Sequence, residues 1–202
     1  MVLAKVEEYR GLYVTGSLVL MLIVAVPTFS LFIRIPDDSE EFSELWLLGP
    51  TLKAEGYPFN VQVNESYLVY VGIGNRLGRS AYYRVYVKLR SQSQPLPVAS
   101  NSSPSMLPVL YEFDVFVRDD EVWEKPLDFA VLDVLTANGS MLLRSLQVNG
   151  FVFQVDDVSL WDEERGGFFY QLFFELWYYN VTLSSFQYHN RFVGLWLNMT
   201  GS

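Results

Sequence analysis

The side chains that most often perform catalysis are scarce in this chain. It has one histidine, His189, and no cysteine. A nucleophile activated by histidine would need His189, which lies beside Asn190 near the end of the sequence. A lone histidine in such a place is more often a surface residue or a hydrogen-bonded core residue. The sequence also lacks a glycine-rich phosphate loop, zinc-ligand spacing and a dinucleotide fingerprint. These observations predict a protein that is not an enzyme and has no cofactor.

Three short acidic runs could bind a hard cation such as calcium through carboxylate oxygens. They are residues 119–121, 156–157 and 162–164. None has the ligand spacing of a known calcium loop, and solvated turns are the simpler interpretation. The sequence therefore assigns no metal site.

The pattern Asn-x-Ser/Thr, which marks acceptors of N-linked glycans, stands out more clearly. The chain has nine asparagines, and five of them begin such a sequon without proline at the middle position. The five predicted glycosylation sites are Asn64, Asn101, Asn138, Asn180 and Asn198. Asn64 is expected on the polar face of a strand, Asn101 in a long loop and Asn138 at a turn, where a bulky sugar would not disturb a core.

A second strong feature is the stretch Gly11–Ile33, which has 23 residues and no charge. A helix of this length covers the roughly 30 Å hydrocarbon core of a bilayer. The pattern predicts a transmembrane helix or uncleaved signal anchor. A cleaved signal peptide and a buried core helix are the alternatives. The run is long for a signal peptide, and its best cleavage motif, Thr28–Ser30, is poor.

Basic residues set the expected orientation of this span. Lys5 and Arg10 precede it, whereas Arg34 is the only basic residue between the span and Lys53. The positive-inside rule then favours a cytoplasmic tail at residues 1–10 and an acidic linker at residues 34–41, followed by an extracellular domain at residues 42–202. The net charge of −9 makes this domain a poor candidate for nucleic-acid binding.

Alternation of apolar and polar residues predicts that this domain is all-β. The expected strands include 59–63, 67–73, 83–89 and 111–117, with a surface loop at 91–108. Two Asn-Gly pairs, at 138–139 and 149–150, suit type I′ turns and predict a meander of three strands. Residues 156–167 are expected to hold a short helix that stops at Gly166-Gly167, before strands at 168–180 and 192–198.

The run Phe168–Asn180 has the strongest strand pattern. Leu172 and Leu176 belong to one continuous apolar face, and Gln171 lies on the other face, among further aromatic residues. We expect nine or ten strands in an antiparallel, Ig-like β-sandwich of two sheets.

Several of these segments resemble an archaeal membrane-protein family, the domain of unknown function sixteen-sixteen. The similar residues are Phe42–Gly49, Tyr57-Pro58, Asn64–Ser66, Val71–Ile73, Asn75, Tyr82-Tyr83, Leu172, Phe174, Leu176-Trp177, Arg191 and Leu195-Trp196. They cover roughly residues 42–90 and 165–198. One departure is Arg76–Gly78, where the family has an acidic residue. The resemblance implies an anchored extracytoplasmic β domain of archaeal source, and it implies no activity.

Two functions remain compatible with these observations. The first is a single-pass, membrane-anchored cell-surface glycoprotein with a binding or structural role in the envelope, whose partners are the lipid bilayer at Gly11–Ile33, N-linked glycans and other envelope proteins. The alternative is a secreted filament subunit. In that case the signal is cleaved and the freed N-terminal segment is donated as a strand to a neighbouring subunit.

Overall fold

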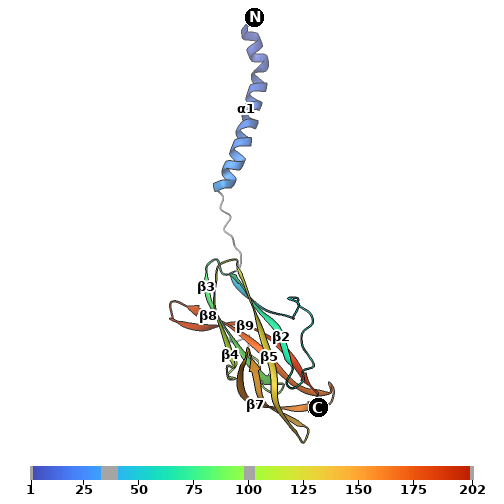
Figure 1. Ribbon diagram of the computed structural model, residues 1–202. Helices are drawn as coiled ribbons and strands as arrows, with labels where there is room; N and C mark the ends of the chain where they lie inside the picture. The colour runs from blue at the N-terminus through green and yellow to red at the C-terminus, as the bar shows by residue number, and fades with distance from the viewer. Residues whose placement is uncertain (1, 33–40, 98–102, 201–202) are drawn as a thin grey trace. The chain divides into compact units, whose positions relative to one another are not determined.

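The protein comprises two compact units, Met1–Glu40 and Glu41–Ser202. A computed structural model describes residues 2–32, 41–97 and 103–200 (Figure 1). Within the first unit, side chains are described for residues 9–25. The predicted linker at 34–41 therefore lies outside the described residues, except for Glu41.

The first unit contains one helix, α1 (Val2–Phe32), which includes residues 11–32 of the predicted span. Large apolar side chains such as Leu12, Leu18 and Met21 are exposed along it. In the described part of the chain, no helix has the length and apolarity that a membrane crossing requires.

The second unit is antiparallel β structure, as predicted. Its strands are β1 (Phe42–Leu48), β2 (Ser66–Arg76), β3 (Ala81–Ser91), β4 (Tyr111–Val117), β5 (Val122–Ala137), β6 (Ser140–Val148), β7 (Phe151–Asp162), β8 (Gly167–Asn180) and β9 (Ser185–Met199). Hydrogen bonding joins them in the order β1-β2-β5-β6-β7-β8-β3-β4, and β9 pairs with the other edge of β8. The structure thus has one open sheet where the sequence predicts two separate sheets.

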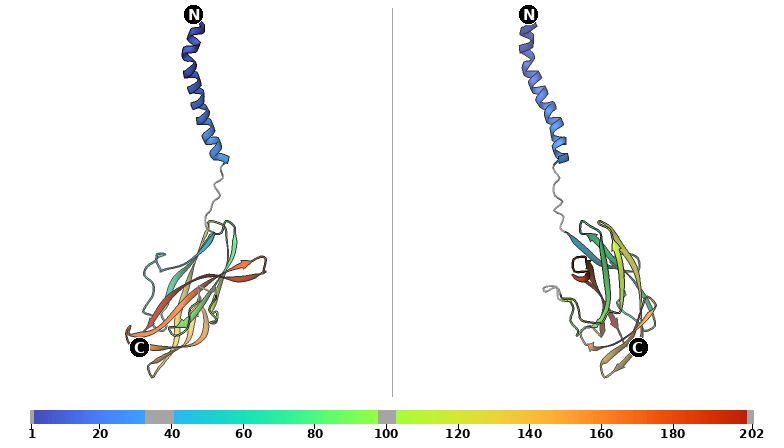
Figure 2. Two further views of the ribbon diagram at one scale, coloured as in Figure 1. Left: turned by 180° about the vertical axis from the view of Figure 1, so that it is seen from behind. Right: turned by 90° about the vertical axis from the view of Figure 1, so that its left-hand side faces the viewer.

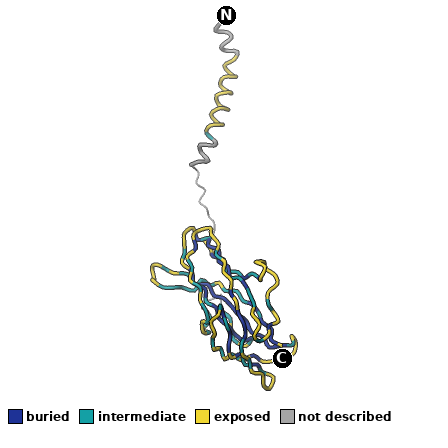
Figure 3. Tube along the Cα trace, viewed as in Figure 1, coloured by how far each residue is buried: buried dark blue, intermediate teal, exposed yellow. Residues whose placement is uncertain are grey.

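Strand β7 explains this difference. It pairs with β6 from Phe151 to Leu160, but only its last two residues, Trp161 and Asp162, pair with β8. The sheet folds over at this short connection. Apolar side chains of β2, β5 and β6 then share one core with those of β3 and β8. Figure 2 shows the strands of this unit from two further sides, and Figure 3 shows the buried stretches along them. The largest fully buried side chains of this core include Tyr83, Phe129, Tyr170, Phe174, Ile73 and Leu143.

The Asn-Gly turns form as predicted. Asn138-Gly139 joins β5 to β6 with φ angles of 51° and 73°, and Asn149-Gly150 joins β6 to β7 with φ angles of 47° and 83°. A type I′ turn needs this left-handed conformation at both central residues. The predicted three-strand meander is therefore confirmed, although β5 begins earlier than expected, at Val122.

Two predicted elements are wrong. Residues 59–63 do not form a strand, because their pairing is limited to an isolated parallel bridge between Asn60 and Asn198. Residues 156–167 do not form a helix, because β7 pairs with β6 as far as Leu160 and with β8 at Trp161 and Asp162, and a tight turn follows. The closing strand also begins earlier than predicted, at Ser185.

Strand β8 is buried on both faces from Gly167 to Leu176. Leu172 and Leu176 point into the core, as predicted. The opposite face is covered in part by Phe59, whose ring lies 6.2 Å from that of Phe169. Gln171 on this face is also buried, and its Oε1 accepts a hydrogen bond of 2.8 Å from Arg90. Gln171 is therefore not the solvent-facing residue that alternation alone suggests.

The buried face of β8 generates a test of the core. Leu172→Ala or Leu176→Ala should lower the free energy of unfolding by about 2–5 kcal/mol, because each leaves a cavity in a closely packed region. Leu183→Ala is the matched control. Leu183 is 60% exposed in the β8–β9 turn, and its truncation should change the free energy by less than about 0.5 kcal/mol. Chemical denaturation of the three variants would contradict this packing if all lost the same small amount.

Candidate functional site

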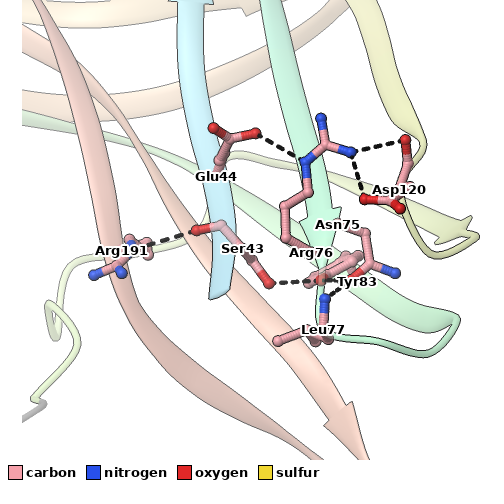
Figure 4. Close-up of polar contacts among 8 residues, drawn as sticks. All are labelled: Ser43, Glu44, Asn75, Arg76, Leu77, Tyr83, Asp120 and Arg191. Carbon is pink, nitrogen blue, oxygen red and sulfur yellow. Dashed lines mark hydrogen bonds and ion pairs between the residues drawn. The ribbon is translucent and has the colours of Figure 1, made fainter. Parts of the chain in front are cut away.

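Three of the residues that carry the family resemblance, Ser43, Asn75 and Tyr83, meet at the beginning of β1. Ser43 of β1, Asn75 of β2, Tyr83 of β3 and His189 of β9 form a hydrogen-bonded row that we name the buried polar chain (Figure 4 labels all but His189). His189 Nε2 lies 2.8 Å from Ser43 Oγ, and Ser43 Oγ lies 2.6 Å from the Tyr83 hydroxyl. Tyr83 donates to Asn75 Oδ1 at 3.0 Å.

These contacts fix where the protons lie. Because the Tyr83 hydroxyl donates to Asn75, it must accept from Ser43. The single Ser43 proton is then used, so His189 Nε2 must carry a proton and donate to Ser43 Oγ. The buried polar chain therefore runs in one direction, from His189 to Asn75.

Asn75 is the fixed end of this chain. Its Nδ2 donates to the carbonyl oxygens of Arg79 at 2.8 Å and Val117 at 3.0 Å, and its Oδ1 also accepts from the Leu77 amide at 3.2 Å. The fully buried amide thus makes four hydrogen bonds and connects the β2–β3 turn with the end of β4. Burial of so many polar groups is tolerated because each has a partner.

Burial also governs the titration of the site. It raises the pKa of Tyr83, so the hydroxyl stays protonated. Burial lowers the pKa of His189, and the nearby Arg191 guanidinium lowers it further. The imidazole is thus neutral at pH 7, with its proton on Nε2. Arg191 itself donates to the Ser43 carbonyl oxygen at 3.4 Å.

Ser43 and His189 are spaced like a nucleophile and its base, a pairing across 146 positions of sequence that sequence reasoning missed. However, Ser43 is only 1% exposed, and its oxygen is already bonded on both sides. A nucleophilic hydroxyl must reach a substrate carbon, and this one is closed to solvent. The geometry suits a structural connection between β1 and β9, and it agrees with the interpretation of His189 as a hydrogen-bonded core residue.

A second polar cluster lies on the outward face of β3 and β8. Lys88 and Glu175 form an ion pair of 2.9 Å, and both side chains are almost completely buried. Ser105 covers the pair, because its amide donates to Glu175 at 2.7 Å and its carbonyl oxygen accepts from Lys88 at 2.7 Å. These bonds hold the segment before β4 against the sheet.

Farther along the same face, a row of four aromatic side chains crosses four strands, and all but the half-buried Phe186 are exposed. Phe116, Tyr82, Tyr179 and Phe186 come from β4, β3, β8 and β9 in that order, and we name them the aromatic strip. Phe116 is the cross-strand neighbour of Tyr82, and Tyr179 is that of Phe186. The Tyr82 ring lies 6.4 Å from Tyr179 and 5.4 Å from Phe186. A groove of about 610 Å³ runs beside the strip.

The predicted glycosylation sites differ in accessibility. Asn64 and Asn138 are exposed at turns, both with left-handed backbone, so Asn64 does not lie on a strand as expected. Asn101 lies outside the described residues. Asn180 is half-buried at the end of β8. Asn198 is only 6% exposed, and its Nδ2 donates to Asn60 Oδ1 at 3.1 Å.

The acidic runs are distributed over separate turns and strands. Asp120 pairs with Arg76 and Glu121 with Arg118, while Asp162 accepts from the Arg165 side chain. Among the residues that the structure describes, no group of three or more acidic or histidine side chains could hold a metal ion.

Sequence comparison gives the family. Residues 36–140, about half of the chain, match the family model described as "Domain of unknown function (DUF1616)". The chain belongs to this family. The match includes Ser43, Asn75 and Tyr83, so three members of the buried polar chain lie within the DUF1616 region. No curated protein matches the sequence.

Solved structures give distant similarities to this DUF1616 protein. One is a β-glucosidase from Listeria innocua in complex with glucose, with 10% identity and a TM-score of 0.36 over 80% of this chain. The chain spans only 16% of that enzyme. Another is the complex of zinc 2-glycoprotein and prolactin inducible protein from human seminal plasma, with 9% identity and a TM-score of 0.38 over 81% of this chain and 98% of the other. No functional conclusion follows from similarities this weak.

The buried polar chain can be tested by removing one oxygen. Tyr83→Phe should lower the free energy of unfolding by about 1–3 kcal/mol, because Asn75 Oδ1 and Ser43 Oγ each lose a partner in a site without water access. Tyr179→Phe removes the same atom from an exposed ring and should have little effect. Equal denaturation midpoints for the two variants would show that the Tyr83 hydroxyl is dispensable.

The single histidine allows a clean pH test. Since the folded state lowers the pKa of His189, the unfolded chain takes up a proton first as the pH falls below about 6.5. The contribution of His189 is therefore fully present above that pH and is lost as the pH falls toward the folded-state pKa. Between pH 7.5 and 5.5, the wild-type chain should lose more stability than His189→Gln. Parallel losses in urea titrations of both proteins would overturn this assignment.

Proposed function

We propose that this DUF1616 protein is a single-pass, membrane-anchored cell-surface glycoprotein with a binding or structural role in the cell envelope and no catalytic activity. The observation that carries the proposal is the N-terminal unit. Helix α1 contains an uncharged run of apolar residues, the side chains of residues 9–24 are exposed, and the helix belongs to a unit separate from the β domain. An uncharged run such as Gly11–Ile33, with apolar side chains on every face of the helix, is typical of a segment surrounded by lipid.

The remaining parts of the proposal follow from the sequence. Lys5 and Arg10 favour a cytoplasmic N-terminus, with the lipid bilayer at Gly11–Ile33 and the β domain extracellular. The finer description of the β domain as an Ig-like sandwich is supported by the fold at β7, which brings two groups of strands around one core. An archaeal source is likewise proposed from the resemblance alone.

The anchor can be tested on protein purified from its native membranes with detergent. Peptide mass spectrometry should recover an N-terminal peptide that begins at Met1 or Val2, because an uncleaved anchor keeps residues 1–10. Alkaline washing should leave the chain in the membrane fraction. A mature protein that begins near Ser30 or Leu31 would show that the run is a cleaved signal and would end the anchor proposal.

Glycopeptide mass spectrometry of the same material tests the predicted modification. We expect N-linked glycans at Asn64 and Asn138, since both side chains are exposed at turns and can carry a bulky group. Asn101 and Asn180 are also proposed sites. Asn198 should be the least occupied, because its Nδ2 is buried against Asn60. Five unmodified asparagines would contradict the glycoprotein proposal.

One structural observation favours the alternative, a secreted filament subunit. Among the described residues, β4 pairs only with β3, and its other edge is open. Beside it lies a groove of about 520 Å³ lined by apolar side chains that include Tyr111, Phe151 and Phe153. An extended segment from a second subunit could add to such an edge. The mass of the mature N-terminus separates this alternative from the anchored form.

A further inference from the structure

The β8–β9 hairpin extends beyond the neighbouring strands (Figure 1), and Asn180, Val181 and Thr182 near its tip line the groove beside the aromatic strip. Its walls include three exposed aromatic side chains, Tyr82, Phe116 and Tyr179. Phe116 is 64% exposed, and Val181 at the hairpin tip is 81% exposed. An exposed apolar patch of this kind is typical of a surface that contacts another group or molecule.

The same groove contains a predicted glycosylation site. Asn180 and Thr182, the first and third residues of the sequon, both line it. Asn180 Oδ1 accepts a hydrogen bond of 3.1 Å from the Leu183 amide, which holds the side chain in place. Within the described part of the chain, Nδ2 of Asn180 has no hydrogen-bond acceptor, and this nitrogen is the atom to which a glycan is attached. Asn198 differs, because its Nδ2 is engaged with Asn60.

The chemistry of the groove suits a sugar. A pyranose ring presents C–H bonds on its faces and hydroxyl groups around its rim. Polarised C–H bonds pack favourably on the negative face of an aromatic ring. The groove adds polar groups at its rim, including the side chain of Arg79, which forms no ion pair with any described residue. These groups can hydrogen-bond to the hydroxyl groups of a sugar.

We propose that the first sugars of an N-linked glycan on Asn180 pack in this groove against Phe116 and Tyr82. The glycan would then cover the aromatic strip and hold the β8–β9 hairpin against β3 and β4. This inference rests on the proposed N-glycosylation of the protein. It assigns Asn180 a glycan with a structural role, whereas glycans at Asn64 and Asn138 project from exposed turns.

The test compares two sequon variants of the full chain, produced in cells that attach N-linked glycans and extracted in detergent. Thr182→Ala removes the Asn180 sequon and leaves the Asn180–Leu183 hydrogen bond intact. Ser66→Ala removes the Asn64 sequon from an exposed turn and is the matched control. Thr182→Ala should unfold at least about threefold faster than the wild type, whereas Ser66→Ala should match the wild type.

A second variant asks whether Phe116 contacts the glycan. Phe116→Ala should speed unfolding of the glycosylated chain but have no further effect once Thr182→Ala has removed the glycan. In a chain that carries ¹³C-labelled glycans, sugar signals from Asn180 should be shifted upfield by the aromatic rings, and Phe116→Ala should reduce that shift.

The outcomes separate this inference from the proposed function. Glycans at Asn64 and Asn138 with an unmodified Asn180 would overturn the inference and leave the glycoprotein proposal standing. A glycan on Asn180 whose removal changes neither unfolding nor the effect of Phe116→Ala would also overturn it. If Phe116→Ala instead abolishes self-association of the chain, the groove is a surface for a second copy. Absence of glycans from all sites would reject both proposals.

Discussion

The beginning of β1 depends on the buried polar chain. Among the residues that the structure describes, strand β1 lies at one end of the hydrogen-bonded sheet and pairs only with β2, so few backbone hydrogen bonds hold it. Ser43 compensates by bonding to Tyr83 and His189 across the fold. Asn75 fixes the far end of the chain through four hydrogen bonds. Polar networks of this kind specify one arrangement, because a shifted strand would leave several buried groups without partners.

The outward face of the β3–β8 pair has a part that is covered by the chain and a part that is open to solvent. Near Ser105 the face is covered, and the Lys88–Glu175 ion pair is buried with all its main bonds made inside the protein. Near Tyr82 the face is open, and aromatic rings reach solvent. Burial of an ion pair has a large desolvation cost, so this pair serves to fix the covering segment more than to add stability.

Some features of the fold could be read from the sequence because they depend on local pattern. The Asn-Gly turns and the inward positions of Leu172 and Leu176 follow from turn chemistry and from a period of two. The strand at residues 156–160 could not be predicted from local pattern, because this polar, acidic segment joins the sheet through its pairing with β6. Gln171 was misjudged for a related reason. Its face of β8 is covered by parts of the chain that are distant in sequence, such as Phe59 and Arg90.

The candidate site also depends on contacts between residues that are distant in sequence. The family resemblance includes Asn75, Tyr83, Arg191 and the segment with Ser43, but a pattern cannot show that Ser43 and His189 touch across 146 positions. Nor can it show that the Asn180 sequon lines an aromatic groove while the Asn198 sequon is buried. Sequons have one sequence signature, and their accessibility is decided by the tertiary fold.

The position of the buried polar chain also bears on the proposed role in the envelope. The N-terminal unit is joined to the β domain through residue 41, so any force on that connection reaches β1 at Phe42 and then Ser43. Ser43 is bonded to β3 and β9, so it would spread the force over strands far from β1 in sequence. A domain without cysteine has no covalent cross-link for this purpose. Hydrogen bonds at the first residues of β1, shielded from water, are the physical means by which such a domain can keep its first strand in place under tension.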